Sequence, residues 1–307
     1  MDLSVTSADL TTVATSADAS AGTSMFIPAP STPYQGDIAR YWDHEARPVN
    51  LRLGDVDGLY HHHYGIGSVD HAALGDPGDG TGEYEKRLIA ELHRLESAQA
   101  ELLLDHLGPI ERDDTLVDAG CGRGGSMVMA HQRFGCTVEG VTLSAKQADF
   151  ANQRARELGI EDHVHARVCN MLGTPFETGR AAASWNNESS MYVDLHDLFA
   201  EHSRILAVGG RYVTITGCWN PRYGQPSKWV SQINAHFECN IHSRREYLRA
   251  MADNRLVPQA VVDLTPATLP YWALRATSSL VTGIEEAFIN SYKDGSFQYF
   301  LIAADRV

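Results

Sequence analysis

The sequence predicts an α/β fold built on a mostly parallel sheet with helices on both faces. Short apolar runs alternate with longer amphipathic stretches from residue 115 onward, which is typical of repeated strand–helix units. The first run, Thr115–Ala119, leads into the glycine-rich segment Gly120–Gly125, and a helical pattern follows at Ser126–Phe134. Ligands of such folds bind at the carboxyl ends of the parallel strands, so we expect the functional residues there.

Composition divides the chain into three parts. Residues 1–33 are rich in Ala, Ser and Thr and are predicted to be a disordered tail. Residues 34–110 begin with an irregular stretch rich in aromatic residues and histidines, include a short helix at Gly36–Trp42, and end in the amphipathic helix Glu83–Leu107. We expect this part to cover the active site as a cap. Residues 111–307 form the main domain.

The elements of the main domain follow from hydrophobic period and from glycine and proline positions. After Thr115–Ala119, strands are expected at Thr137–Val141, His163–Cys169, Ala181–Asn186, Arg211–Cys218, Val257–Leu264 and Phe297–Ala304. Further helices are expected at Ala145–Leu158, Leu195–Leu206, Lys228–Phe237, Ser243–Asn254 and Ile284–Lys293. Gly209 and Gly210 should form a turn before the fifth strand.

Charge and cysteine content exclude several classes of function. The formal net charge is −14 and the sequence has no basic run, which argues against a nucleic-acid partner. The five cysteines are scattered, without C-x-x-C spacing, so we expect reduced thiols and a cytoplasmic location. An acidic residue follows the first Met and no long apolar run is present, so no signal peptide or membrane span is expected.

The glycine-rich turn is compatible with two classes of cofactor. Gly120, Gly122 and Gly125 match the G-x-G-x-x-G dinucleotide pattern, with Glu139 near the expected acidic position. However, Asp118 would repel a bound pyrophosphate, whereas it suits a cationic sulfonium ligand that carries an amino group. The D-x-G-C-G-x-G pattern resembles motif I of the class I S-adenosylmethionine (SAM)-dependent methyltransferases. This resemblance implies a Rossmann-like sheet of seven strands in which the last strand returns as a hairpin.

The resemblance assigns cofactor contacts to the other strand ends. The segment G-V-T-L-S-x-x-Q is similar to the branch that contains cyclopropane fatty acid synthases and sterol methyltransferases, so Thr142 and Gln147 should contact the ribose although most of the superfamily has an acid at this strand end. Asn170 and Met171 should face the adenine, unless Asn170 is an ordinary polar strand end. The full set of expected cofactor contacts is Asp118, Gly120, Cys121, Gly122, Thr142, Gln147, Asn170, Met171, Asn186 and Tyr60.

Two further groups have a functional and a structural interpretation. Glu188 follows a strand at the mouth of the expected cleft, which favours a general base, but it could also cap the next helix or pair with an arginine. The consecutive residues His61, His62 and His63 suggest a metal site, yet adjacent residues rarely face one point and no acidic or cysteine partner is nearby in the sequence. We therefore expect the triplet to belong to the cap.

Several longer segments resemble the actinobacterial geranyl diphosphate 2-C-methyltransferases, which act before 2-methylisoborneol synthase. These segments are Y-H-H-H-Y-G-I-G, W-N-N-E-S-x-M-Y-V-D-L-H, G-C-W-N-P-R-Y-G and I-N-A-H-F-E-C-N-I-H-S-R-R-E-Y. The resemblance covers about residues 34–307. It implies methylation of C2 of geranyl diphosphate to (E)-2-methylgeranyl diphosphate, with SAM and Mg²⁺, in an enzyme that we expect to be a homo-oligomer. Substrate-binding inserts are expected at about 219–256 and 265–285.

The same resemblance assigns catalytic and substrate-binding residues. Tyr64 and Phe237 would stabilise a carbocation with their π faces, and Glu188 would take the proton or organise the metal. Asn50, Tyr299 and Arg222 would complete the substrate site, with Lys228 and Arg275 as further basic candidates. Mg²⁺ would be held by the diphosphate and water, because the sequence lacks a D-D-x-x-D cluster.

Two alternatives remain at this point. The chain could methylate oxygen or nitrogen of another small molecule, which would normally require an acid or histidine beside the acceptor atom. It could also bind SAM without catalysis, although the intact glycines and the available Glu188 argue against this interpretation.

Overall fold

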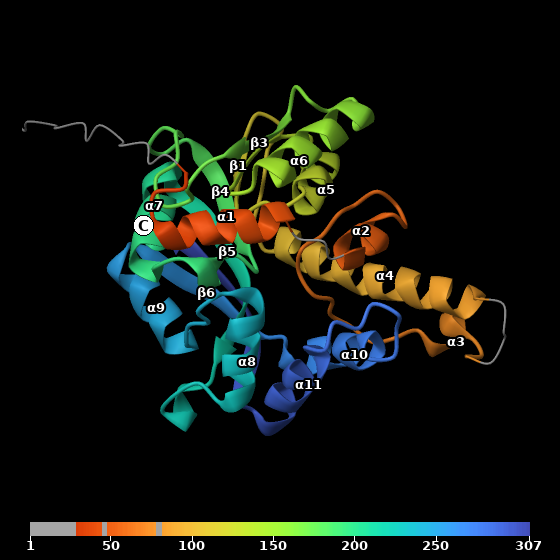
Figure 1. Cartoon of the computed structure of the whole chain (residues 1–307). Helices are drawn as coiled ribbons and strands as arrows, with labels where there is room; N and C mark the ends of the chain where they lie inside the picture. Colours follow the sequence, from red (N-terminus) through yellow and green to blue (C-terminus); the bar gives the residue numbers. More distant parts are fainter. Residues whose placement is uncertain (1–28, 45–47, 78–81) are drawn as a thin grey trace, which may run out of the picture.

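The computed structural model describes residues 29–44, 48–77 and 82–307. Its centre is a seven-stranded sheet of order β3-β2-β1-β4-β5-β7-β6. Strands β1 to β5 pair in parallel, and β7 lies antiparallel between β5 and β6. The prediction of a mostly parallel, seven-stranded sheet that ends in a hairpin-like return is confirmed. Figure 1 shows helices on both sides of the sheet.

The strands agree with the apolar runs of the sequence. They are β1 (Thr115–Ala119), β2 (Thr137–Thr142), β3 (Val164–Val168), β4 (Ala181–Asn187), β5 (Leu206–Trp219), β6 (Leu256–Asp263) and β7 (Phe297–Arg306). The helices of the main domain are α5 (Gly125–Phe134), α6 (Ala145–Leu158), α7 (Leu195–Ile205), α8 (Lys228–Phe237), α9 (Arg244–Asp253), α10 (Thr265–Arg275) and α11 (Glu285–Asp294), with 3-10 turns η1 (Ser190–Tyr192) and η2 (Pro221–Tyr223). The preceding helices are α1 (Pro33–His44), α2 (Pro48–Gly54), α3 (His71–Leu74) and α4 (Glu83–Asp105).

Two apolar cores lie on opposite faces of the sheet. One joins α4, α5 and α6 to the sheet and extends to α10 and α11. The other lies beneath α7 and α9 and contains Leu198, Phe199 and Tyr247. Because both faces are covered, the carboxyl-end edge is where the sheet can bind a ligand.

Helix α1 crosses the carboxyl ends of the strands (Figure 1). Near its end, the Asp43 carboxylate accepts hydrogen bonds from Ser144 Oγ (2.6 Å) and from the Lys146 backbone N–H (3.2 Å). Near its start, Gln35 Oε1 accepts a hydrogen bond from Asn170 Nδ2 at 3.1 Å. The helix is thereby attached to the ends of β2 and β3.

The structure corrects three details of the predicted elements. Gly209 and Gly210 lie inside β5, where the pairing with β4 shifts register, rather than in a turn before it. The predicted insert 265–285 contains α10, which includes Pro266 at its start and Pro270 inside. Helix α1 begins at Pro33, and Ser31 already contacts Asn170, so order begins before the predicted end of the tail. The rest of that tail, residues 1–28, lies outside the described residues.

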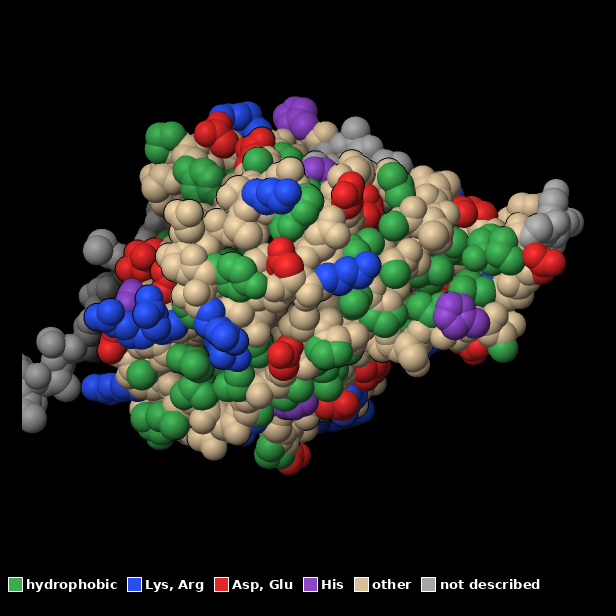
Figure 2. Space-filling model, turned by 90° about the horizontal axis from the view of Figure 1, so that it is seen from below, with side chains coloured by type: hydrophobic (Ala, Val, Ile, Leu, Met, Phe, Trp, Pro, Cys, Tyr) green, Lys and Arg blue, Asp and Glu red, His purple; other side chains and the backbone are tan. Residues whose placement is uncertain are grey.

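The surface seen from the α8 and α11 side carries hydrophobic side chains interspersed with charged side chains of both signs (Figure 2). In the part of the chain that the structure describes, no helix combines the length and the apolar composition needed to cross a membrane.

Candidate active site

A cavity of about 1210 Å³, part of it open to solvent, lies at the carboxyl ends of β1, β2 and β4. Five of the predicted cofactor contacts line it, namely Gly120, Gly122, Thr142, Gln147 and Met171. The predicted substrate and catalytic residues Asn50, Tyr64, Glu188, Phe237 and Arg275 also line it. The fold therefore brings together residues that are up to 225 positions apart in the sequence, from Asn50 to Arg275.

The glycine-rich loop forms one wall of the cavity. Gly120 has φ +92°, and a Cβ there would lie 2.3 Å from Cβ of Ser189, so only glycine fits. Ser189 Oγ donates to the Ala119 carbonyl at 2.7 Å, and Asn186 Nδ2 donates to the same carbonyl at 2.5 Å. These bonds hold the start of the loop against the end of β4. Asn186 is fully buried and supports the loop without lining the cavity.

Thr142 and Gln147 form a pair at the end of β2. Thr142 Oγ1 donates to Gln147 Oε1 at 2.9 Å, and both side chains are buried. Ser144 is the N-cap of α6, and its hydroxyl donates a hydrogen bond to the Asp43 carboxylate. The amide group of Gln147 keeps its Nε2 donor for a ligand, which is compatible with a ribose contact.

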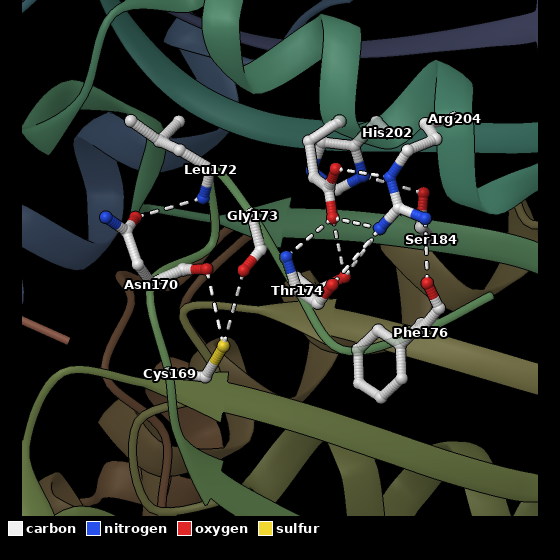
Figure 3. A network of polar contacts seen from close by, with 10 residues as sticks. Cys169, Asn170, Leu172, Gly173, Thr174, Phe176, Ser184, His202 and Arg204 are labelled. Atoms are coloured by element: carbon white, nitrogen blue, oxygen red, sulfur yellow. Dashed lines mark hydrogen bonds and ion pairs between the residues drawn. The ribbon is translucent and has the colours of Figure 1, made fainter. Parts of the chain in front are cut away.

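Asn170 is engaged by helix α1 rather than open to the cavity. Its Nδ2 donates to Ser31 Oγ and Gln35 Oε1 at 3.0 and 3.1 Å, and its Oδ1 accepts from the Leu172 N–H. Figure 3 shows Asn170 in the loop that follows β3 and, further along this loop, Thr174 beside Arg204. Thr174 donates hydrogen bonds to Glu201, and its hydroxyl accepts one from Arg204. Asn170 therefore joins the loop after β3 to the N-terminal segment that contains α1.

Several predicted residues lie outside the cavity lining. Asp118 in β1 and Cys121 within the glycine-rich loop are buried. Tyr60 packs its ring on Phe150 and donates a hydrogen bond to Asp55. Arg222 and Lys228 are exposed, and neither is part of the lining. The structure does not bring these five side chains to the cavity. The predicted substrate residue Tyr299 is likewise fully buried and is not part of the lining. Burial raises the pKa of Asp118 to about 8, which favours its neutral form.

Glu188 directly follows β4 and lines the cavity. Its backbone has φ +53°, a left-handed conformation that costs free energy outside glycine. Burial raises the pKa of its carboxyl to about 8, and the hydroxyl of Tyr299 hydrogen-bonds this carboxyl and opposes that rise. Oε1 has no hydrogen-bond partner among the described residues. Such an oxygen can accept a proton from a ligand.

Aromatic rings enclose the space next to Glu188. The centroid of the Tyr64 ring lies 6.3 Å from that of Phe237, 5.1 Å from Phe288 and 4.5 Å from Trp272. Trp272 and Phe288 are stacked at 3.8 Å. The π faces of this cluster suit a cationic or isoprenoid group. Sequence reasoning missed Phe288 and Trp272, because lone aromatics in a helix normally belong to the core.

Arg275 brings a positive charge to the cavity. It is 7% exposed, and its Nε lies 3.3 Å from Glu285 Oε1 without a hydrogen-bonding geometry. Its Nη1 makes a long bond, 3.4 Å, to the Tyr271 hydroxyl. A buried guanidinium with so few short bonds retains donors for an anionic ligand.

Two members of the histidine triplet, His62 and His63, line the cavity, whereas His61 lies in the core. His61 and His63 are buried, and the His61 ring stacks on that of His93 with centroids 5.6 Å apart. Burial lowers the pKa of both His61 and His63. His62 lines the cavity between Asn50 (3.1 Å) and Arg123 (2.6 Å). Among the residues that the structure describes, no cluster of three or more His, Cys, Asp or Glu side chains could hold a metal ion.

The sheet order, together with a glycine-rich loop that ends β1 and lines the cavity, defines a class I SAM-dependent methyltransferase. The sequence family described as mycolic acid cyclopropane synthetase matches residues 62–217. More closely, the chain belongs to the geranyl diphosphate 2-C-methyltransferase family. It is 87% identical to the member from Streptomyces lasalocidi over 92% of this chain and 93% of that protein. It is 80% identical to the member from Streptomyces coelicolor over 97% of this chain and all of that one.

Solved structures support the same assignment. A geranyl diphosphate methyltransferase in complex with GPP and sinefungin is 88% identical and covers 90% of this chain and all of its own, with a TM-score of 0.88. The Streptomyces coelicolor enzyme in complex with Mg²⁺, geranyl-S-thiolodiphosphate and S-adenosyl-L-homocysteine is 83% identical and covers 91% and 100%, with a TM-score of 0.90. The resemblance predicted from the sequence is confirmed.

Proposed function

We propose that this chain transfers a methyl group from SAM to C2 of geranyl diphosphate and so forms (E)-2-methylgeranyl diphosphate. The observation that carries the proposal is the Glu188 carboxyl, which has an available oxygen between the glycine-rich loop and a cluster of aromatic rings. The conditions for alkene methylation are a positioned donor, a surface that tolerates positive charge, and a base. In this proposal the glycine-rich loop positions the donor, the aromatic rings tolerate the charge and Glu188 is the base. The product would supply the enzyme that makes 2-methylisoborneol.

The reaction balances without an added redox partner. The C2–C3 π electrons of the acceptor form a bond to the methyl carbon, and the C–S bond breaks with its electrons going to sulfur, which becomes the neutral thioether of S-adenosylhomocysteine. The positive charge then lies on C3. Loss of the C2 proton restores the C2–C3 double bond, and the released proton must be taken up by a base.

Aromatic side chains stabilise the charge at C3 in this proposal. Tyr64 and Phe237 come from the cap and from α8, and both line the cavity. A cation over a ring within about 6 Å of its centroid gains up to about 2 kcal/mol when desolvated. Phe288 also lines the cavity, with its centroid 6.3 Å from that of Phe237. These rings also exclude water, which would otherwise trap the cation.

Glu188 accepts the C2 proton. A carboxyl with a pKa of about 8 holds a proton much more strongly than an ordinary glutamate, so its ionised form is a stronger base. The neighbouring sulfonium of bound SAM favours that ionised form before the reaction. The Glu188 carboxylate can then act as a base near neutral pH.

The diphosphate end requires positive charge, and the residues present fit a diphosphate that carries its own Mg²⁺. Arg275 and Asn50 line the cavity as donors. Among the described residues no set of three or more His, Cys, Asp or Glu side chains could hold a metal ion, so Mg²⁺ would be held chiefly by the diphosphate and water. Bound Mg²⁺ would neutralise part of the diphosphate charge.

The test is mass spectrometry of the products formed from the protein, SAM and geranyl diphosphate, with Mg²⁺ and with EDTA. We expect a product heavier by one CH₂ unit, released by phosphatase as a methylated monoterpene alcohol, that disappears with EDTA. Binding of SAM without any such product would overturn the substrate assignment. An O- or N-methylated product from another acceptor would favour the alternative class of methyltransferase.

We also propose that the enzyme acts as a cytoplasmic homo-oligomer on this small molecule and on no nucleic acid. The net charge of −14 supports the absence of a nucleic-acid partner. All five cysteines are free thiols, four of them buried, which fits a reducing compartment. Light scattering of the purified protein measures its oligomeric state, and a monomer mass would overturn that part.

A further inference from the structure

A hydrogen-bonded group of three side chains lies behind Glu188 and has no part in the mechanism above. Gln99, from the middle of α4, is fully buried. Its Nε2 donates to the Tyr299 hydroxyl at 3.0 Å and to Asn187 Oδ1 at 2.7 Å. Its Oε1 accepts from Asn187 Nδ2 at 2.9 Å. The group joins the cap helix α4 to the end of β4 and to β7.

The donors and acceptors of this group determine the direction of the Tyr299 O–H. A phenol has one proton to donate, and its oxygen can accept. The Tyr299 oxygen accepts from Gln99, so its own proton remains for another acceptor. The Glu188 carboxyl hydrogen-bonds the same hydroxyl. The O–H therefore points at Glu188 and leaves Oε1 as the carboxyl oxygen without a partner.

We propose that Gln99 is a positioning residue, which makes Tyr299 donate its proton to Glu188 and so fixes and stabilises the carboxylate that accepts the substrate proton. Without the amide of Gln99, the Tyr299 O–H can turn to the freed Oδ1 of Asn187. The carboxylate would then lose its donor, and its ionised form would become less favourable. This role rests on the proposed function of Glu188 as the base.

The test is the pH dependence of single-turnover product formation in Gln99→Leu, Tyr299→Phe and the double variant. Each single variant should move the acidic limb of the profile to higher pH by about one unit, because one charge-assisted hydrogen bond is lost. The double variant should show the same shift as Tyr299→Phe alone. If Gln99 acted through packing alone, Gln99→Leu would shift the acidic limb by the same amount in the wild-type chain and in Tyr299→Phe. Such additive shifts would overturn the proposal.

Asn152→Leu serves as a matched control. Its amide also makes two hydrogen bonds, to the backbone of Ala166 (2.8 Å each), but on α6 and β3. This variant should lose stability without moving the limb. If the acidic limb of the pH profile shifted equally in Asn152→Leu, the shift would reflect loss of stability. That result would contradict the proposal.

Two measurements keep the outcome decisive. Gln99→Met replaces Gln99→Leu if the latter does not fold. An NMR titration of ¹³C-labelled glutamate carboxyls, with the Glu188 signal assigned from Glu188→Gln, gives the same pKa without turnover. Product formed by the wild-type chain with an unmoved Glu188 pKa in the Gln99 variants would overturn this inference alone, whereas failure of the wild-type chain to methylate geranyl diphosphate would overturn the proposed function.

Discussion

At the scale of single residues, Glu188 combines a left-handed backbone, a raised pKa and an oxygen without a partner. Local strain of this kind persists only where the surroundings over-determine it, and it is concentrated at functional sites. Replacing the carboxyl by the amide in Glu188→Gln keeps the shape and removes the base. We expect kcat to fall by about 10²–10⁴-fold while the Kd for SAM, measured by calorimetry, stays within about threefold. Unchanged kcat would exclude Glu188 as the base.

The pH dependence of the rate follows from the same carboxyl. The ionised form is active, so the rate of the wild-type enzyme should rise with pH. The midpoint should lie at or below about 8, because burial raises the pKa to that value and the sulfonium lowers it. Single-turnover rates across the pH range measure this limb, and we expect the residual activity of Glu188→Gln to lack it.

Substitutions of Phe237 test whether the rate depends on the π face of its ring or only on the volume of its side chain. Phe237→Leu keeps an apolar side chain but removes the ring, and we expect kcat to fall by up to about thirtyfold, equivalent to about 2 kcal/mol of cation–π interaction. Phe237→Tyr should restore most of the rate. Equal loss in both variants, measured as kcat with saturating substrate, would show that the shape of the pocket matters and the π system does not.

Asp118 offers a test of stability, because its folded-state pKa of about 8 lies well above its ordinary value of 3.8. The folded chain thus favours the neutral form, and stability falls as pH rises from about the unfolded pKa up to 8. In Asp118→Asn this loss is absent. The ligand-free variant should melt within error of wild type at the acid end of this window and roughly 2–4 °C or more above it at pH 8. A wild-type Tm that stays higher at pH 8 would contradict the buried neutral form.

At the scale of elements, α1 crosses the carboxyl ends of the strands, where we expect SAM to bind, and Asp43 attaches it to α6. We expect Asp43→Ala to weaken SAM binding by about tenfold, since two hydrogen bonds to a carboxylate are lost. Asp37→Ala is the control, because Asp37 pairs only with Arg40 of the same helix among the described contacts. Calorimetry measures both Kd values, and an equal change in the two variants would argue against attachment through Asp43.

The elements themselves were largely predictable. Helix Ala145–Leu158 and strand Thr115–Ala119 agree with the prediction residue for residue, because Ser144 and Gly159 mark the helix ends and the strand is a short apolar run. Helix α10 was missed because Pro266 and Pro270 are signals against a helix. Gly209 and Gly210 predicted a turn, but in the structure they are part of β5, where its pairing with β4 shifts register.

The site was predictable only where a motif or a resemblance identified it. The glycines of the loop and Thr142 could be placed from local pattern, whereas Tyr64 and Phe237 came from resemblance alone. Gln99 shows the remaining limit. It lies in an amphipathic helix, α4, whose sequence contains no motif that points to a functional role. Only the tertiary contacts reveal that its side chain hydrogen-bonds Tyr299, which in turn contacts Glu188.

At the scale of the whole molecule, the N-terminal segment, the sheet edge and the helices α8, α10 and α11 contribute residues to the cavity in which we expect donor, acceptor and base to meet. The central claim is that a methyl group goes to C2 and that the C2 proton leaves. The most direct measurement uses geranyl diphosphate with deuterium at C2. We predict a methylated product that has lost all deuterium. A methylated product that retains deuterium would contradict the account, because the methyl group would then lie on another atom.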